Sequence, residues 1–370
     1  MKQTEIGLIP DDWEVKKLGD IYNFQYGDGN TNPSNNGAYP VYGANGIIGG
    51  YTKFNAVDSI VIGHMGEYAG SVIWASGKHF VTYNGTITKP KDEKNLNPKY
   101  GYYSLLFKNI NKICAGSGYP FLAYDKLNLI SIPLPPLAEQ QRIAKALSDV
   151  DALISKTEKL IQKKKNIKQG AMQNLLTGKK RLPGFAKSTR TKMTELGEIP
   201  EDWEVKNLGE MLKIGHGKDY KNLKSGNVPV YGTGGYMTSV NDFLYEGETV
   251  CIGRKGTIDK PQYHSGKIWT VDTLFYTYDF KSLNPKYLFY KFCLIDWLSM
   301  NEASGVPSLT AKNIEDIQIA IPTVEEQTAI ANVLSSMDKE IETLNTKLEK
   351  YRNLKTAMMQ QLLTGKIRLM

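Results

Sequence analysis

The chain has 370 residues, of which 41% are hydrophobic and 23% charged, as is ordinary for a soluble globular protein of two or three domains. No run approaches the ~18–20 apolar residues of a membrane span, and the N-terminus lacks a secretory signal pattern, so we expect no membrane association. Three cysteines and four histidines without metal-ligand spacing indicate a cytoplasmic, metal-free protein, and a net charge of +8 favours a polyanionic partner.

Residues 1–134 are predicted to form an α+β domain. The segments SIVIGHMG, GSVIWAS and HFVTYNGTI read as strands separated by glycine turns. Helical character follows the LNPKY motif at 96–100, in YYSLLFKNI. Short strands combined with a helix indicate a mixed α+β fold.

Residues 135–178 are predicted to form a long helix that starts behind Pro135 and Pro136 and ends at Gly178. Its heptad seam holds Ile143, Leu147, Val150, Ile154, Ile161 and Leu175. A second row widens the apolar face: Leu153, Leu160 and Ile167. The mid-helix lysines are expected to snorkel or to meet acidic groups, while a solvated face and a DNA contact both remain open: Lys163, Lys164, Lys165 and Lys168.

A basic linker without periodic pattern is predicted over 179–193, and the segment 194–321 then repeats the first domain. TEIGLIPDDWEVKKLGD at Thr4 returns as TELGEIPEDWEVKNLGE at Thr194. PVYG, an Ile-Gly-x-x-Gly loop, LNPKY and a closing LLTGK follow in the same order in both copies. The chain is therefore a duplication of one module, a domain followed by a helix.

The second long helix falls within 322–370. Thr323 and Glu326 form a predicted capping box, and Gly365 supplies the stop. The apolar seam, with Ile330 and Leu362 near its ends, is Leu334, Met337, Ile341, Leu344, Leu348, Tyr351 and Met358. Each helix ends where the other copy's domain begins, so the predicted fold is two similar α+β domains separated by two long helices packed as an antiparallel coiled coil, with internal pseudo-two-fold symmetry.

These motifs resemble the specificity subunit of type I restriction–modification systems. The openings IPDDWEVKKLG and IPEDWEVKNLG are similar to the starts of its target-recognition domains. IPLPPLAEQQRIAKAL and IPTVEEQTAIANVL are similar to the starts of its helical spacers, which end in LLTGK-type sequences. The resemblance covers essentially the whole chain. The second spacer departs from the fuller pattern, although Pro322, Glu326 and Gln327 still match Pro135, Glu139 and Gln140.

The resemblance implies a non-catalytic subunit that reads a bipartite, asymmetric site in double-stranded DNA across an unspecified gap. It implies that the helices fix the gap and dock two modification (methyltransferase) subunits, and that restriction/translocase subunits complete the complex. S-adenosylmethionine, ATP and Mg²⁺ would belong to those partners, so no cofactor is expected in this chain.

No catalytic motif contradicts that expectation. Asn97-Pro98-Lys99-Tyr100 carries a lysine where the tetrapeptide of an adenine methyltransferase needs a second proline, which favours a helix-start turn. Asp11 with Glu14 and Lys16 has the composition of a nuclease site, but these residues share one short segment. No phosphate-binding loop of the Gly-x-x-x-x-Gly-Lys-Ser/Thr type occurs.

Candidate DNA contacts are positions where the repeated scaffold carries different side chains. The Ile-Gly-x-x-Gly loop holds His64 and Met65 in the first copy, where the second has Arg254 and Lys255; arginine can pair bidentately with guanine. A solvent-facing hairpin tip remains the alternative. A second candidate loop spans 42–46 in the first copy and 231–235 in the second; its Asn45 could read adenine, and a role in the turn itself is the alternative. Basic candidates suited to phosphates are Lys218, Lys221 and Lys224, and Lys78 is a further candidate.

One other function stays open, and the missing catalytic motifs argue against a third. A non-catalytic coiled-coil scaffold joining two protein-binding domains would use the helical seam alone. A stand-alone methyltransferase or nuclease would show activity without partners.

Overall fold

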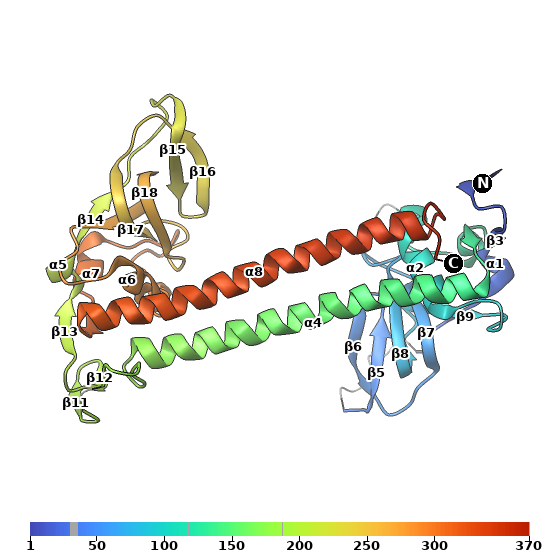
Figure 1. The fold of residues 1–370 in the computed structure, drawn as a ribbon, viewed down its shortest axis with the longest axis horizontal. Helices are drawn as coiled ribbons and strands as arrows, with labels where there is room; N and C mark the ends of the chain where they lie inside the picture. Colours follow the sequence, from blue (N-terminus) through green and yellow to red (C-terminus); the bar gives the residue numbers. More distant parts are fainter. Residues whose placement is uncertain (30–35, 117, 187, 370) are drawn as a thin grey trace. The chain divides into compact units, whose positions relative to one another are not determined.

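The structure is a computed structural model that describes residues 1–29, 36–116, 118–186 and 188–369. The chain divides into two compact units, Met1–Glu158 with Thr346–Met370 (unit 1) and Lys159–Asn345 (unit 2). Each unit holds one sheet-rich domain and part of both long helices (Figure 1). The two predicted α+β domains and the two long helices are therefore confirmed.

The domain of unit 1 is built on a six-stranded sheet with the order β4-β9-β7-β8-β5-β6. Only the contact between β5 and β8 is parallel. The strands are β1 (Lys2–Thr4), β2 (Gly7–Ile9), β3 (Glu14–Lys17), β4 (Tyr22–Tyr26), β5 (Tyr39–Gly43), β6 (Gly46–Tyr51), β7 (Ala56–Gly63), β8 (Val72–Val81), β9 (Gly85–Pro90) and β10 (Ser131–Leu134). The helices are α1 (Leu18–Ile21), α2 (Pro98–Lys108), α3 (Tyr124–Asn128) and a 3-10 turn (Ile110–Ile113).

Helix α2 begins at the LNPKY motif, as predicted. The Asn97 side chain accepts a hydrogen bond from the Tyr100 backbone N–H, and Pro98 occupies the first turn, where its missing N–H costs nothing. The helix packs against β7 and β8, and buries Tyr100, Tyr103 and Leu105. The Asn-Pro-Lys-Tyr segment is thus a helix start, and Asn284 caps its counterpart in unit 2 in the same way.

One strand differs from the prediction. GSVIWAS and HFVTYNGTI were expected to be separate strands, but β8 runs through Gly77 without a break. Gly77 adopts a positive φ of 67°, and its N–H donates to the Asp58 carboxylate where the pairing of β7 shifts register. A β-bulge at this point accommodates the left-handed conformation of Gly77, so β8 continues past it.

The domain of unit 2 repeats this topology, with the sheet order β14-β19-β17-β18-β15-β16. Its strands are β11 (Thr191–Thr194), β12 (Gly197–Pro200), β13 (Glu204–Asn207), β14 (Lys213–His216), β15 (Ser225–Gly232), β16 (Gly235–Val240), β17 (Tyr245–Gly253), β18 (Gln262–Thr270), β19 (Leu274–Tyr278) and β20 (Gln318–Ile321). Its helices are α5 (Leu208–Met211), α6 (Pro285–Phe292), α7 (Ala311–Glu315) and a 3-10 turn (Trp297–Met300). Strand β11 begins inside the segment predicted as a linker, because it pairs with β12 as a hairpin.

The long helices are α4 (Leu137–Leu176) and α8 (Val324–Leu362), of 40 and 39 residues. Beyond them Gly178 and Gly365 adopt positive φ, as expected of helix-stopping glycines. The predicted capping box at α8 forms only in half. The Thr323 hydroxyl accepts from the Glu326 N–H at 3.5 Å, whereas the Glu326 carboxylate is bound by Arg181.

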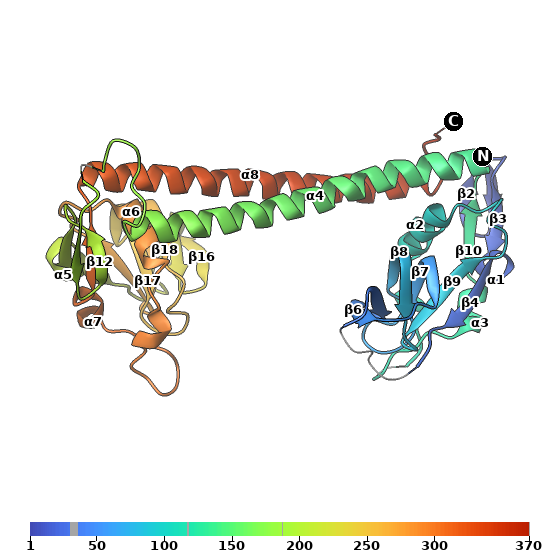
Figure 2. The same cartoon turned by 90° about the horizontal axis from the view of Figure 1, so that it is seen from below.

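Within each unit α4 and α8 lie side by side and antiparallel (Figures 1 and 2). In unit 1, Asp151 pairs with Lys355 and Glu158 with Arg352; in unit 2, Lys164 pairs with Glu340 and Lys168 with Asp338. In both units, residues with higher numbers on α4 pair with residues with lower numbers on α8, as antiparallel helices require. Two of the mid-helix lysines thus meet acidic groups.

The apolar seam lies between the helices, and the second row does not. Buried seam residues are Leu147, Val150, Ile161, Leu334 and Leu348. Half-buried seam residues are Ile154, Met337, Ile341, Leu344, Tyr351 and Met358. The second row, Leu153, Leu160 and Ile167, stays 40–46% exposed. Among the described residues, no helix combines the length and the apolar character needed to cross a bilayer.

Candidate nucleic-acid interface

The Ile-Gly-x-x-Gly loop has the same backbone frame in both units. In unit 1, the His64 N–H donates to the Asn84 carbonyl oxygen and the Gly66 N–H to that of Pro120, each at 2.8 Å. In unit 2, the Arg254 N–H donates to the Thr273 oxygen and the Gly256 N–H to the Pro307 oxygen, again at 2.8 Å. The duplicated fold therefore presents different side chains from one conserved backbone position.

In unit 2 this position is basic and open. Arg254 and Lys255 are exposed and line a hollow of about 500 Å³ together with His216, Asp272 and Ser308. Arg254 Nη1 donates to the Asp272 carbonyl oxygen at 3.3 Å, which leaves most of the guanidinium donors for another acceptor. Such a group suits the O6 and N7 atoms of guanine or a phosphate.

In unit 1 the same position is aromatic and closed. His64 is only 6% exposed, and its Nδ1 lies 2.9 Å from the Leu122 carbonyl oxygen. Its ring packs on Tyr26, whose ring stacks in turn on Tyr124, each at 4.1 Å between centroids. Burial raises the pKa of Tyr26. His64, a candidate DNA contact, is thus enclosed by the aromatic cluster and packs within the loop, and its role in DNA contact stays a prediction.

Several apolar or aromatic side chains near this loop are at least partly exposed. Met65 is half-buried and pairs through its backbone with Phe121, which is 43% exposed. Tyr83 and Tyr119 are 39% and 63% exposed. These side chains can contact a thymine methyl group or stack on a base.

A second predicted loop lies beside the first in each unit. Asn45 is exposed in the turn between β5 and β6, and Ser71 Oγ beside the first loop donates to the Ala44 carbonyl oxygen. In unit 2, Gln262 Nε2 donates to the Gly232 oxygen at 2.9 Å, and a Cβ on Gly256 would lie 3.7 Å from Thr233 Oγ1. The tertiary structure thus joins two separately predicted loops into one surface.

The predicted lysines are only partly brought to this surface. Lys218 is exposed two residues after His216, and Lys221 lies 3.8 Å from the Asp219 carboxylate. Lys224 lies at the open end of the β15–β16 hairpin, next to Asn241. Lys78 pairs with Val57 on the β7–β8 ladder, at the end away from His64.

Sequence reasoning missed several residues of the surface. Tyr26 and His216 occupy equivalent places at the ends of β4 and β14, each before a glycine, and only a comparison of the two copies could have found them. The hairpin tips also expose pairs of large apolar side chains, Ile47 and Ile48 in unit 1 and Tyr236 and Met237 in unit 2, at 45–65%.

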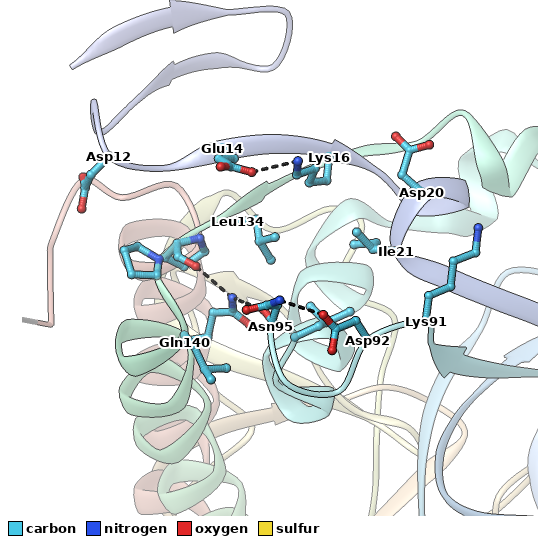
Figure 3. A pocket seen from close by; sticks show the side chains of 14 residues that line it. Asp12, Glu14, Lys16, Asp20, Ile21, Lys91, Asp92, Asn95, Leu134 and Gln140 are labelled. Atoms are coloured by element: carbon cyan, nitrogen blue, oxygen red, sulfur yellow. Dashed lines mark hydrogen bonds and ion pairs between the residues drawn. The ribbon is translucent and has the colours of Figure 1, made fainter.

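A further hollow of about 540 Å³ in unit 1 lies where the domain meets the start of α4 (Figure 3). Glu14 pairs with Lys16 at 2.9 Å, and that contact lowers the pKa of Glu14. Asp12, Asp20 and Asp92 also line it. Across the described residues, no group of three or more His, Cys, Asp or Glu side chains could hold a metal ion.

Comparisons with known proteins agree with this architecture. The family model described as type I restriction modification DNA specificity domain matches residues 10–169 and 200–350. The chain is 31% identical to a putative MjaX specificity subunit of Methanocaldococcus jannaschii, over 99% of this chain and 96% of that one. It is 28% identical to the MjaVIII specificity subunit of the same organism, over 97% and 94%. The crystal structure of an S subunit from M. genitalium superposes with a TM-score of 0.71 at 18% identity, covering 98% of both chains.

Proposed function

This chain belongs to the family of type I restriction–modification DNA specificity subunits, and we propose that it reads a bipartite, asymmetric site in double-stranded DNA. The observation that carries the proposal is the repeated loop frame with different side chains. Unit 2 offers Arg254 and Lys255 where unit 1 offers an aromatic cluster around His64. Two domains with one backbone and unlike chemistry suit two unlike half-sites.

The half-sites follow from that chemistry. We propose that unit 2 reads a half-site containing guanine through Arg254, because a bidentate arginine–guanine contact discriminates by ~1–3 kcal/mol. Unit 1 contributes apolar and stacking contacts, with Asn45 available to adenine. Lys218 and Lys255 suit phosphates, which position a protein without reading sequence.

The helices suit a spacer role. A helix of 40 residues such as α4 is ~60 Å long at 1.5 Å per residue, and it cannot bury its apolar stripe alone. We propose that α4 and α8 fix the gap between half-sites and dock two modification subunits. Catalysis, with S-adenosylmethionine, ATP and Mg²⁺, then belongs to the modification and restriction/translocase subunits, and this chain supplies specificity without a cofactor of its own.

Footprinting tests the proposal. The chain, alone or with its modification subunits, should protect a duplex in two patches separated by a gap of fixed length. One uninterrupted patch would contradict the bipartite site. A protein-binding scaffold would leave the footprint empty, and its elution and thermal stability would not change when DNA is added.

A further inference from the structure

One arginine closes the junction between domain and helices in each unit. We name these junctions arginine joint 1 (Arg368, Glu139, Asp12 and Trp13, in unit 1) and arginine joint 2 (Arg181, Glu326, Asp202 and Trp203, in unit 2). Each arginine lies in the LLTGK-x-R-L segment that follows a long helix, and each glutamate lies in the first turn of the other helix. Each aspartate and tryptophan belong to the domain, between its first hairpin and the next strand.

Arginine joint 1 uses both edges of the guanidinium. Arg368 Nε and Nη2 donate to the Glu139 carboxylate at 2.8 Å, and Nη1 and Nη2 donate to Asp12 at 2.9 and 2.7 Å. The guanidinium carbon lies 5.7 Å from the Trp13 ring, and Trp13 Nε1 donates to Glu139 at 3.0 Å. The hydrogen bond from Arg368 lowers the pKa of Asp12.

Arginine joint 2 repeats the pattern. Arg181 Nε and Nη2 donate to Glu326 at 2.5 and 2.6 Å, and Nη1 and Nη2 donate to Asp202 at 2.7 and 3.0 Å. The guanidinium carbon lies 5.6 Å from the Trp203 ring. Both copies of the duplicated module keep this fork geometry, although their other side chains differ in many places.

The glutamates of both joints are buried. Glu139 is 4% exposed and Glu326 is 1% exposed, and a buried carboxylate without its partner is strongly unfavourable. The glutamine that follows each glutamate forms further hydrogen bonds between the helix and the domain. Gln140 Nε2 donates to the Asn95 and Pro135 oxygens (Figure 3). Its Oε1 accepts from the Asn97 N–H. Gln327 makes the equivalent bonds in unit 2.

We propose that Arg368 and Arg181 are positioning residues that set the angle of each recognition domain on its helices, and thereby the preferred gap between half-sites. This inference rests on the proposed bipartite reading. One side chain ties three segments: the domain arm, the start of one helix and the end of the other. Because DNA rises 3.4 Å per base pair, a domain rotation that moves a reading loop by ~3–4 Å changes the preferred gap by one base pair.

The test is Arg368→Ala in the complex with modification subunits, on duplexes whose gap varies by one and two base pairs around the preferred length. Arg352→Ala is the matched control, because Arg352 also bridges two carboxylates, Glu158 and Glu349, but at exposed positions of the same unit. Wild type and Arg352→Ala should prefer one gap by at least about tenfold, and Arg368→Ala by about threefold or less. Discrimination between correct and altered half-sites should persist.

Asp12→Ala covers the case in which Arg368→Ala does not fold. It removes the more exposed contact and leaves the buried Arg368–Glu139 pair. A broadened gap preference with intact half-site discrimination supports the inference. An unchanged gap preference in the folded variant, or equal loss of half-site discrimination, overturns it. If the wild type itself shows no preference for a bipartite site, that result contradicts the proposed function and not the role of the arginine joints.

Discussion

Lys291 allows a quantitative prediction about how the domain of unit 2 is held to α4. Its side chain is half-buried on α6, and Nζ donates to the carbonyl oxygen of Leu176, the last residue of α4, at 2.8 Å. Burial lowers the pKa of Lys291 from 10.5 to about 8. The helix C-terminus counteracts this in part, because its free carbonyl groups favour a cation.

The lowered pKa of Lys291 makes the free energy of unfolding depend on pH. Below pH 8 the Lys291 ammonium is charged in the folded and in the unfolded chain, so the folded chain bears the full free-energy cost of burying that charge. Between about pH 8 and 10.5 the unfolded chain binds more protons, so the free energy of unfolding contributed by Lys291 rises with pH. At 1.36 kcal/mol per pKa unit, the rise is at most about 3 kcal/mol. Because the side chain is partly exposed, we expect ~1–2 kcal/mol.

Urea unfolding of wild type and Lys291→Met at pH 7.5, 9 and 10.5 measures this term, since other titrations cancel in the difference. The free energy of unfolding of the wild type should rise relative to that of Lys291→Met as the pH increases. Lys281→Met, which removes an exposed lysine of the same unit, is the matched control for the loss of one positive charge. A pH-independent difference for Lys291→Met would refute the reasoning.

Three further predictions concern specificity, spacing and packing. Arg254→Ala should lose ~1–3 kcal/mol of discrimination in one half-site only, measured by binding to duplexes substituted base by base. Four residues inserted into both helices at matched positions should add ~6 Å at 1.5 Å per residue and lengthen the gap by one or two base pairs in methylation mapping. Leu334→Ala, at a fully buried seam position packed with Met172 and Leu175, should cost ~2–5 kcal/mol in thermal unfolding, whereas the exposed Leu153→Ala should cost less than ~0.5 kcal/mol.

The candidate DNA-contact surface was only partly predictable from the sequence. The repeat located both loops correctly, because glycines that adopt positive φ leave a local signature. It did not show that His64 is enclosed by Tyr26 and Tyr124, since those rings come from β4 and α3. Burial depends on contacts between distant segments, and a single position in the sequence carries no record of them.

The arginine joints show the same division. The repeated LLTGK-x-R-L segment contains both arginines. Nothing near Arg368 in the sequence, however, indicates that Glu139 is its partner. The local Thr323–Glu326 pattern predicts a complete capping box. The structure gives the Glu326 carboxylate to Arg181 instead, because a charged fork binds a carboxylate more strongly than a backbone N–H does.

The sequence by itself determined the duplication, the two long helices and their ends, and the family, because heptad spacing, helix-stopping glycines and repeated motifs are local or self-matching signals. Tertiary structure alone decided the strand order of both sheets with one parallel pairing in each, the union of two loops into one surface, and the partners of the joint arginines. Those features depend on strand pairing and burial between residues far apart in the chain, where many alternatives satisfy the same local pattern and only the packed core selects one.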